Sequence, residues 1–437
     1  MDSNRVVITG LGAISPLGLN VSDMWEGLCS GKSGIDKITV FDPAGFGCQL
    51  AGQAPEYKIQ QYVPKSYRKA VKLMCRDIEL AVIAAREALV NSKLTTKGID
   101  PENININPQR MAINIGAGLI SCDLVELANA AAVSITDGEF DIRKWGKHGI
   151  EQVPPLWLLK YLPNMLACHI SIIHDIQGPS NSITCGEASA HLSISEASQI
   201  IARGGSDIAL AGGAEAKVNP MDITRQCLLK RATTENNHEP ASACRPFDAD
   251  AKGSVFGEGA GMVILENLEH AQRRGAKIYA EVVGTGQSSN INPAYEHLEA
   301  DGKGIQIAIE KALAQAQIKP DDLDLIIPHG TGIPDDDLAE ARAIEAALGS
   351  VATKKAVWPT KSMLSNTGAA SGAIDVIATV CAMNENKIPA AKNCNEKTEG
   401  CNLNIIKESM KMKVSYALSC SYTFGGQTAA VVLKLPD

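Results

Sequence analysis

Apolar strands that alternate with amphipathic helices constrain the fold of this chain more than any other feature. Residues 5–10, 111–116 and 208–213 are apolar almost throughout and contain or adjoin glycine, whereas residues 77–89 have the periodicity of an amphipathic helix. Strands that lack polar alternation are typical of sheets covered on both faces. The pattern therefore predicts an α/β protein built of layers.

The second part of the chain repeats this alternation without a clean sequence repeat. Strands are expected at residues 280–286, 325–328, 414–419 and 428–434, and helices at residues 304–317 and 373–385. No low-complexity linker separates the parts. We therefore expect two similar halves, residues 1–265 and 266–437, packed in one body.

One long segment does not fit the alternation. Residues 120–162 contain Trp145, Trp157 and the pair Pro154–Pro155, and they show no regular periodicity. The sequence predicts an irregular excursion here that caps a pocket or forms a subunit contact.

Charge and cysteine content exclude several classes of protein. The formal charge is −8, which argues against a nucleic-acid-binding protein but not against a local basic patch for an acidic partner. The 12 cysteines include no C-x-x-C pair, which argues against a structural zinc site. Free thiols and an N-terminus without a signal-peptide pattern predict a cytoplasmic protein. No apolar run approaches the ~20 residues of a membrane span.

Residues 178–215 carry the pattern with chemical meaning. A short strand at residues 182–184 turns into a helix of small residues at 187–203, and the strand at 208–213 follows. The N-terminus of a helix favours negative charge. The turn thus predicts a site for an anionic side chain, and Glu187 stands there.

Six segments together resemble the β-ketoacyl-acyl-carrier-protein synthase family. The resemblance extends over nearly the whole chain and depends on the order and spacing of the segments. They are residues 5–18, 163–178, 245–261, 329–340, 361–363 and 424–426.

The resemblance implies a thiolase-like fold, with two similar halves in a layered α-β-α-β-α arrangement, and usually a dimer. It implies decarboxylative Claisen condensation, in which a cysteine takes an acyl group from acyl carrier protein. The phosphopantetheine arm of that carrier comes with the substrate, and no further cofactor is expected.

The chain departs from the family at two catalytic positions. The register places Glu187 where the family has its nucleophilic cysteine, and Cys185 falls two residues earlier. His329 matches the first catalytic histidine and Lys361 the lysine, but Asn366 stands at the second histidine. A carboxylate cannot hold a lasting thioester, and an amide cannot carry a proton.

Three further positions are expected to bind substrate. Phe424 matches the phenylalanine that gates the acyl site, and Thr331 lies in the segment expected to hold the phosphopantetheine arm. Ile333 replaces a threonine that commonly helps to hold this arm.

These departures predict a non-condensing subunit, most like a chain-length factor, that forms a heterodimer with an active synthase in fatty-acid or polyketide biosynthesis. One alternative is an active 3-oxoacyl synthase that uses Cys185. Another is a malonyl-carrier decarboxylase, although the loss of the second histidine opposes it.

Structural explanations remain open for several of these residues. Thr184 and Glu187 have the spacing of a capping box. His329 and Lys361 could be inherited structural residues, Asn366 could be a core amide, and His191 is expected to be a core histidine. The run Asp335–Asp336–Asp337 is expected to form a solvated loop rather than a metal site.

Overall fold

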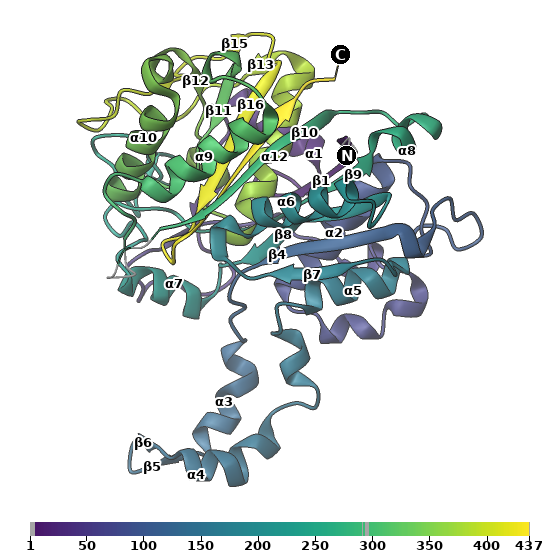
Figure 1. Cartoon of the computed structure of the whole chain (residues 1–437). Coiled ribbons are helices and arrows are strands. Elements are labelled where there is room, and N and C mark those ends of the chain that lie inside the picture. Colours follow the sequence, from purple (N-terminus) through teal and green to yellow (C-terminus); the bar gives the residue numbers. More distant parts are fainter. Residues whose placement is uncertain (1–4, 291, 293–296, 437) are drawn as a thin grey trace.

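A mixed β-sheet runs through the molecule in the computed structural model, which describes residues 5–290, 292 and 297–436 (Figure 1). Within these residues the sheet has 11 strands, which fall into two groups with the same pattern of directions. In each group, parallel strands lie at the outer end and antiparallel strands lie toward the middle of the sheet. The predicted N-terminal half begins at residue 1, and its residues 1–4 lie outside the described part.

The first group comes from the N-terminal part of the chain. From the outer edge inward, its strands are β7 (Ser180–Ile183), β4 (Met111–Ala117), β8 (Ile208–Ala216), β9 (Glu258–Asn267) and β1 (Val6–Ile14).

The second group comes from the C-terminal part and mirrors the first. From the middle outward, its strands are β10 (Ala280–Ser289), β17 (Gln427–Lys434), β16 (Tyr416–Tyr422), β11 (Leu325–Ile327), β12 (Ala356–Val357) and β14 (Asn404–Ile405). Antiparallel pairing of β1 with β10 joins the two groups. The division at residue 265 stays a prediction, because the strands of both groups form one sheet.

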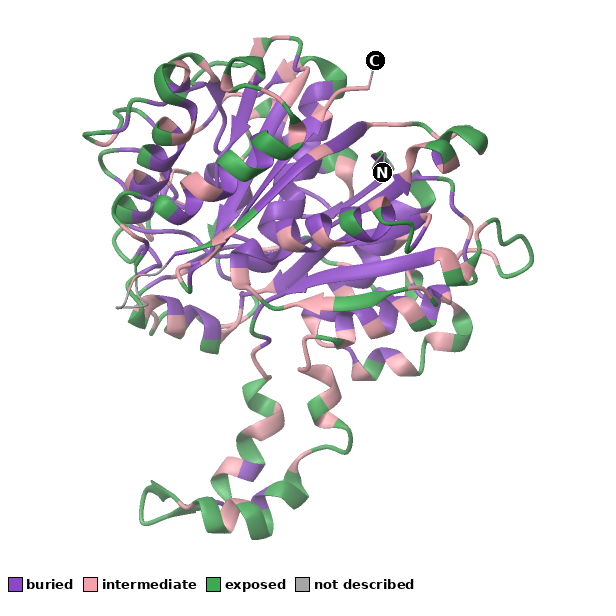
Figure 2. Cartoon of the chain, in the orientation of Figure 1, coloured by how far each residue is buried: buried purple, intermediate pink, exposed green. Residues whose placement is uncertain are grey.

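Helices form three layers around these strands. The central helices α6 (Ser189–Ala202) and α12 (Ser371–Glu385) contact each other and strands of both groups. On the outer faces lie α2 (Arg76–Asn91) with α5 (Met165–His174), and α9 (Lys303–Ala316) with α10 (Pro334–Leu348). The arrangement confirms the predicted layered α/β fold, and it buries the strands as their apolar character requires (Figure 2).

Residues 120–162 form an arm that projects from the body (Figure 1). The prediction of an irregular segment is wrong in part, because the arm contains the helix α3 (Leu124–Ala132). The Asp123 side chain caps this helix by accepting a hydrogen bond from the Val125 N–H. Much of the arm is exposed (Figure 2), including Val125, whose exposed fraction is 80%. Its apolar side chains therefore have no core of their own to fill.

No helix in the described ranges combines the length and the apolar character needed to cross a membrane.

Candidate active site

The turn that carries Glu187 connects the edge strand β7 to the buried helix α6. Gly186 has a left-handed backbone (φ +52°), which a glycine adopts without strain, and it opens the 3-10 turn η8 (Gly186–Ala188). A Cβ atom at Gly186 would lie 3.0 Å from Thr423 Oγ1, so the turn lies against the segment before Phe424. The exposed fraction of Glu187 is 4%, which places its carboxylate inside the molecule at the start of α6.

The predicted capping box is not formed. The residues that cap η8 and α6, Cys185 and Ala188, make no side-chain capping hydrogen bond. Instead, the Cys185 N–H donates to Ser189 Oγ at 2.8 Å, and this hydroxyl donates to the Ala117 carbonyl at 3.1 Å. The start of the helix therefore does not depend on the Glu187 carboxylate.

Cys185, the alternative nucleophile, is half-buried beside this turn. Burial raises the pKa of its thiol above the ordinary value. A nucleophilic cysteine needs the opposite shift, because the thiolate is the reactive form. The local environment thus disfavours the mechanism that would use Cys185.

His329 follows β11 and is buried. Its ring makes an edge-to-face contact with Tyr422, with 4.7 Å between the ring centroids. Burial lowers the pKa of His329 well below its ordinary value, and the charge of Lys361 lowers it further. The imidazole is therefore neutral, and its Nδ1 has no hydrogen-bond partner among the described residues.

Two buried carboxylates hold the loop at His329. Glu340 accepts hydrogen bonds from the backbone N–H groups of His329 at 2.7 Å and Gly330 at 2.8 Å. Asp337 accepts them from the Thr331 N–H at 2.8 Å and the Gly332 N–H at 3.0 Å. The loop is thus fixed through its backbone, whatever its side chains do chemically.

The prediction of a solvated loop at the aspartate run is wrong for two of its three residues. Asp335 is exposed, but Asp336 and Asp337 are buried in the first turn of α10. Asp337 also accepts a hydrogen bond from the Thr331 hydroxyl at 3.1 Å. Ile333 is buried at the start of the same helix. Four local donors, three of them backbone N–H groups, compensate the burial of the Asp337 carboxylate.

Lys361 lies in the core and pairs with Asp375. The distance between Lys361 Nζ and Asp375 Oδ2 is 2.9 Å, and both side chains are almost fully buried. The Thr360 hydroxyl donates to the other oxygen of Asp375 at 2.5 Å. Lys361 is thus an ion partner in the core, and its charge also reaches His329.

Asn366 occupies the predicted position of the second histidine and is fully buried. Its Oδ1 accepts a hydrogen bond from the Gly368 N–H at 3.0 Å. Its Nδ2 has no hydrogen-bond partner in the described part of the chain. One end of the amide therefore serves the backbone, and the other end is left available as a donor.

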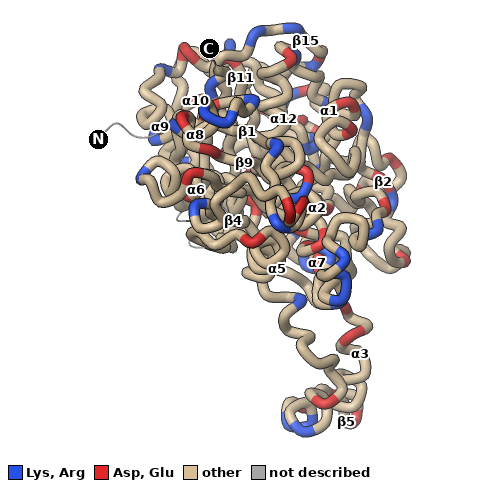
Figure 3. Tube along the Cα trace, turned by 90° about the vertical axis from the view of Figure 1, so that its right-hand side faces the viewer, with Lys and Arg blue, Asp and Glu red and all other residues tan. Residues whose placement is uncertain are grey.

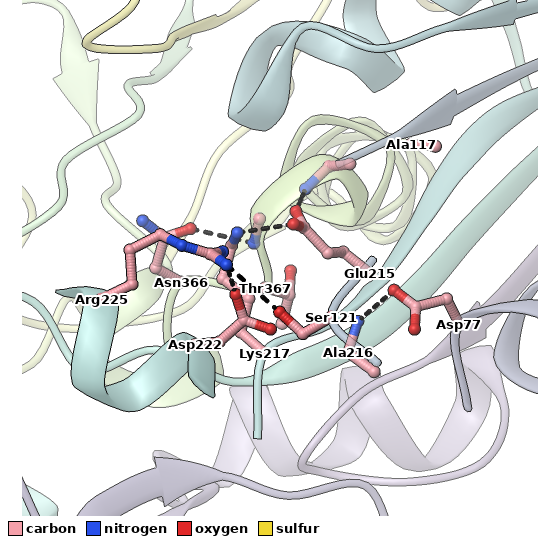
Figure 4. A network of polar contacts seen from close by, with 12 residues as sticks. Asp77, Ala117, Ser121, Glu215, Ala216, Lys217, Asp222, Arg225, Asn366 and Thr367 are labelled. Carbon is pink, nitrogen blue, oxygen red and sulfur yellow. Dashed lines mark hydrogen bonds and ion pairs between the residues drawn. The ribbon is translucent and has the colours of Figure 1, made fainter. Parts of the chain in front are cut away.

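A buried lysine that the sequence pattern did not reveal, Lys217, lies near Asn366 (Figure 4). Lys217 Nζ is 2.5 Å from Glu215 Oε1, and the second oxygen of Glu215 accepts a hydrogen bond from the Ala369 N–H at 2.6 Å. Figure 4 shows this network at the end of β8, next to Asn366. Gly368 has a φ of +59°, and a Cβ atom there would lie 2.0 Å from the Glu215 carboxylate, so only glycine fits.

Burial alone would lower the pKa of Lys217, but nearby carboxylates outweigh this effect and raise it. Glu215 contributes most, followed by Glu187 and Asp222. Lys217 is therefore a charged ammonium group within electrostatic reach of Glu187. A buried ion pair, Lys217 with Glu215, therefore lies near Glu187.

A second buried ion pair was also missed. Arg231 donates to Asp336 Oδ2 at 2.8 Å, and both side chains are buried. The guanidinium carbon of Arg231 lies 4.6 Å from the centroid of the Phe424 ring. The two charged residues are 105 positions apart, so no local pattern could have revealed the pair.

His191 is a core histidine, as predicted. Its two ring nitrogens lie 2.7 Å from Ser421 Oγ and 2.9 Å from Ser419 Oγ, both on β16. Burial lowers the pKa of His191 to about 3, so the ring is neutral.

The predicted site residues come together from distant segments. The turn η8, which carries Glu187, contacts η12 (Gly368–Ala370) next to Asn366 and also contacts β16 and β17 on either side of Phe424. His329 lies within electrostatic reach of Lys361. Within the described residues, no group of three or more His, Cys, Asp or Glu side chains could hold a metal ion.

Family models match most of the chain. The N-terminal domain of β-ketoacyl synthase matches residues 3–271, and its C-terminal domain matches residues 279–395. The chain belongs to the β-ketoacyl synthase family. This confirms the family that the six motifs indicated, whereas the chain-length-factor subtype stays a prediction.

Curated relatives of this ketosynthase-family chain match end to end. The 3-oxoacyl-[acyl-carrier-protein] synthase 2 of Coxiella burnetii is 34% identical, with 99% of both chains covered. The protein of the same name from Vibrio cholerae is 32% identical and covers 99% of this chain and 100% of its own.

Solved structures show the same fold. The ishigamide ketosynthase/chain length factor has a TM-score of 0.84 at 29% identity, with 100% of both chains covered. A type II polyketide ketosynthase, solved in complex with its acyl-carrier protein and bound to the hexaketide, has a TM-score of 0.82 at 27% identity, also with full coverage of both.

Proposed function

We propose that this chain is a non-condensing ketosynthase-family subunit that works beside an active synthase in fatty-acid or polyketide biosynthesis. One observation carries the proposal: a buried glutamate, Glu187, stands at the turn where the family has its nucleophilic cysteine. A carboxylate at this position cannot form a lasting thioester, so the acyl transfer that begins condensation has no acceptor.

The surroundings of Glu187 support the proposal. Lys217 and Glu215 place buried charges next to the turn, where an acyl chain would need apolar contacts. Asn366 offers one free amide donor but cannot exchange a proton as a histidine does. The raised pKa of Cys185 also opposes an active synthase that uses this thiol.

Pairing with a second ketosynthase-fold subunit accounts for two exposed features. Strand β7 is an edge strand bonded to β4 on one side, and Ser180 and Asn181 on it are exposed. The arm exposes a set of large apolar side chains: Leu124, Val125, Val133, Ile135, Phe140, Ile142, Ile150, Leu156 and Leu158. A surface of this kind fits a partner protein, and we propose an active synthase as that partner.

An acyl carrier protein is the second proposed partner. Lys65, Arg68, Lys69 and Lys72 are exposed on 3-10 turns next to the base of the arm, in a chain whose net charge is −8. Figure 3 shows lysine and arginine positions where the arm leaves the body. A basic patch on an acidic protein suits an acidic carrier. The phosphopantetheine arm of the carrier would be the carried group, and we propose a cytoplasmic location.

The loss of acyl transfer is tested by intact-mass measurement after incubation with acyl-loaded carrier protein. We expect no acyl adduct on the wild-type chain. An adduct that disappears in Cys185→Ala would overturn the proposal in favour of an active synthase. Release of CO₂ from malonyl carrier protein that depends on His329 would instead indicate a decarboxylase.

Pairing is tested by co-expression with a ketosynthase encoded near this chain. We expect a stable heterodimer, and Val125→Glu with Ile142→Glu on the arm should weaken it. The matched control is Val90→Glu, an exposed valine on helix α2 of the body. Self-association alone, unaffected by the arm variants, would count against the proposal.

A further inference from the structure

We propose that Arg231 is a positioning residue that holds the Phe424 ring closed over the Glu187 site, and that its ion pair with Asp336 fixes it there. This contact controls how reagents reach the Glu187 site, whether or not the chain pairs with an active synthase. It makes access a second barrier to chemistry, separate from the loss of the nucleophile.

Arg231 is anchored by one side-chain ion pair and by two backbone hydrogen bonds. Its N–H group donates to Asp336 Oδ2 at 2.8 Å, and both side chains are buried. Its backbone N–H donates to the Gln226 carbonyl at 3.0 Å, and its own carbonyl accepts from the Ser254 N–H at 2.8 Å. A cation anchored in this way provides a fixed platform for an aromatic ring.

Phe424 lies in the tight turn between β16 and β17. The Thr423 N–H donates to the Gln427 carbonyl, and the Gly426 N–H donates to the Thr423 carbonyl, both at 2.9 Å. Phe424 is half-buried, and Gly425 next to it is exposed. The ring therefore lies between the solvent and the buried charges. Gly426 is buried, and its carbonyl accepts from the Asn290 N–H at 2.6 Å, so movement of the ring depends on the exposed Gly425. The contact of the ring with the Arg231 guanidinium, 4.6 Å from the ring centroid, opposes such movement.

The same turn borders the Glu187 site. Thr423 lies against Gly186, the residue before Glu187. Burial raises the pKa of Asp336, and the charge of Glu187 is among the groups that raise it further, which places Asp336 within electrostatic reach of Glu187. The Arg231 charge in turn reaches His329. Phe424 and its platform thus stand between the outside and the two central residues of the site.

Arg231 and Asp336 each have a buried polar atom that no third residue of the described chain satisfies. Arg231 Nε and Asp336 Oδ1 are buried and have no hydrogen-bond partner in the described residues. Each group therefore depends on the other, and removal of one would leave the other as an uncompensated buried charge. The test accordingly changes both residues together.

The experiment measures access with a thiol-reactive probe. Glu187→Cys, made in a Cys185→Ser background, introduces a thiol in the site, and its rate of alkylation by iodoacetamide is followed by fragment-ion mass spectrometry, which separates it from Cys168 in the same segment between Lys160 and Arg203. Adding Arg231→Leu with Asp336→Asn should raise this rate about tenfold, the factor expected for the loss of a ~1.4 kcal/mol cation–π contact. Phe424→Ala in the same background should raise it by a similar factor, and the combination should add little.

Controls separate positioning from general loosening. Arg110→Leu with Asp207→Asn removes an ion pair, whose N–O distance is 2.7 Å, at the opposite end of β4 and β8 from Lys217, and should leave the rate unchanged. Arg231→Lys keeps the cation and should keep the rate low. If the Arg231 variant does not fold, Phe424→Leu supplies the test, because leucine fills the space but has no π face. Equal rates in the wild-type background and in the Arg231 and Phe424 variants would overturn the proposal.

Discussion

The loop at His329 and the turn at Glu187 meet in one site but are held in different ways. The loop is bound through its backbone to Asp337 and Glu340, which accept from consecutive N–H groups. The turn is held by Gly186 and Ser189, and its central side chain takes no part in capping the helix. The same protein therefore contains one segment of the site that is part of the framework and one whose central side chain is exchangeable.

This difference explains how a family member can lose chemistry and keep its fold. Asp337 and Glu340 cannot change without leaving backbone N–H groups of the His329 loop unsatisfied in the interior. A change of the side chain at position 187 leaves the turn and the helix in place. Retained motifs around His329 are thus evidence of fold and are weak evidence of catalysis.

The largest effect is expected from Asp337→Ala. It should lower the free energy of unfolding by about 3–5 kcal/mol, because several buried donors lose their acceptor. Denaturation by urea measures the change. Asp335→Ala, in the exposed first residue of the same run, is the matched control and should have an effect below about 0.5 kcal/mol. Equal losses of stability in Asp337→Ala and Asp335→Ala would show that the buried Asp337 carboxylate is not part of the framework.

The second largest effect is expected from the buried Lys217–Glu215 pair near Glu187. Lys217→Met should cost about 3 kcal/mol of stability, because it leaves the Glu215 carboxylate buried without its cation. The double variant Lys217→Met with Glu215→Gln should recover much of this loss. Thermal unfolding of the wild type, the two single variants and the double variant gives the coupling free energy between Lys217 and Glu215. If the double variant were no more stable than the single one, the pair would not act as a unit.

Stability should also fall as the pH rises from about 5 to about 8. Burial raises the pKa of Asp77, Glu87 and Asp337 to about 7 and that of Glu340 to about 8. In this window these four carboxyl groups bind more protons in the folded protein than in the unfolded chain, where their pKa values are ~4. They outnumber the buried histidines whose pKa values are lowered furthest and act in the opposite direction, His174, His191 and His329, so raising the pH favours unfolding. We expect the free energy of unfolding, measured by urea denaturation, to fall by more than about 1 kcal/mol across the window.

Glu87→Gln should flatten this pH profile, since it removes one of the acids outside the site. Glu26→Gln, at an exposed position of helix α1 (Val21–Ser30), should not. A stability that increases with pH in the same range would contradict the directions of these shifts.

The smallest effect is expected at the position that defines the proposal. Glu187→Gln should change the free energy of unfolding by less than about 1 kcal/mol, because the helix start does not use this carboxylate. A loss as large as that of Asp337→Ala would show that Glu187 belongs to the framework, and the comparison of the two segments would then fail.

Prediction from sequence worked best where a local pattern carries the information. The helix expected at residues 77–89 is α2 (Arg76–Asn91), and the strand expected at 111–116 is β4 (Met111–Ala117). It failed where side chains find distant or unexpected partners. The capping box at Thr184 was displaced because Ser189 supplies the acceptor, and the aspartate run was judged solvated although Asp337 meets donors from its own loop and from Phe247.

The amino-acid sequence alone determined the order of apolar strands and helices and the family motifs. It also determined that Glu187 and Asn366 stand where the family has its cysteine and its second histidine. Periodicity and motif spacing are properties of the chain itself. Only the folded structure decided that Lys217, Arg231 and Asp336 are buried charges around this site. Burial and ion pairing arise from contacts between segments far apart in the chain, and the cost of removing a charge from water depends on which partners those contacts supply.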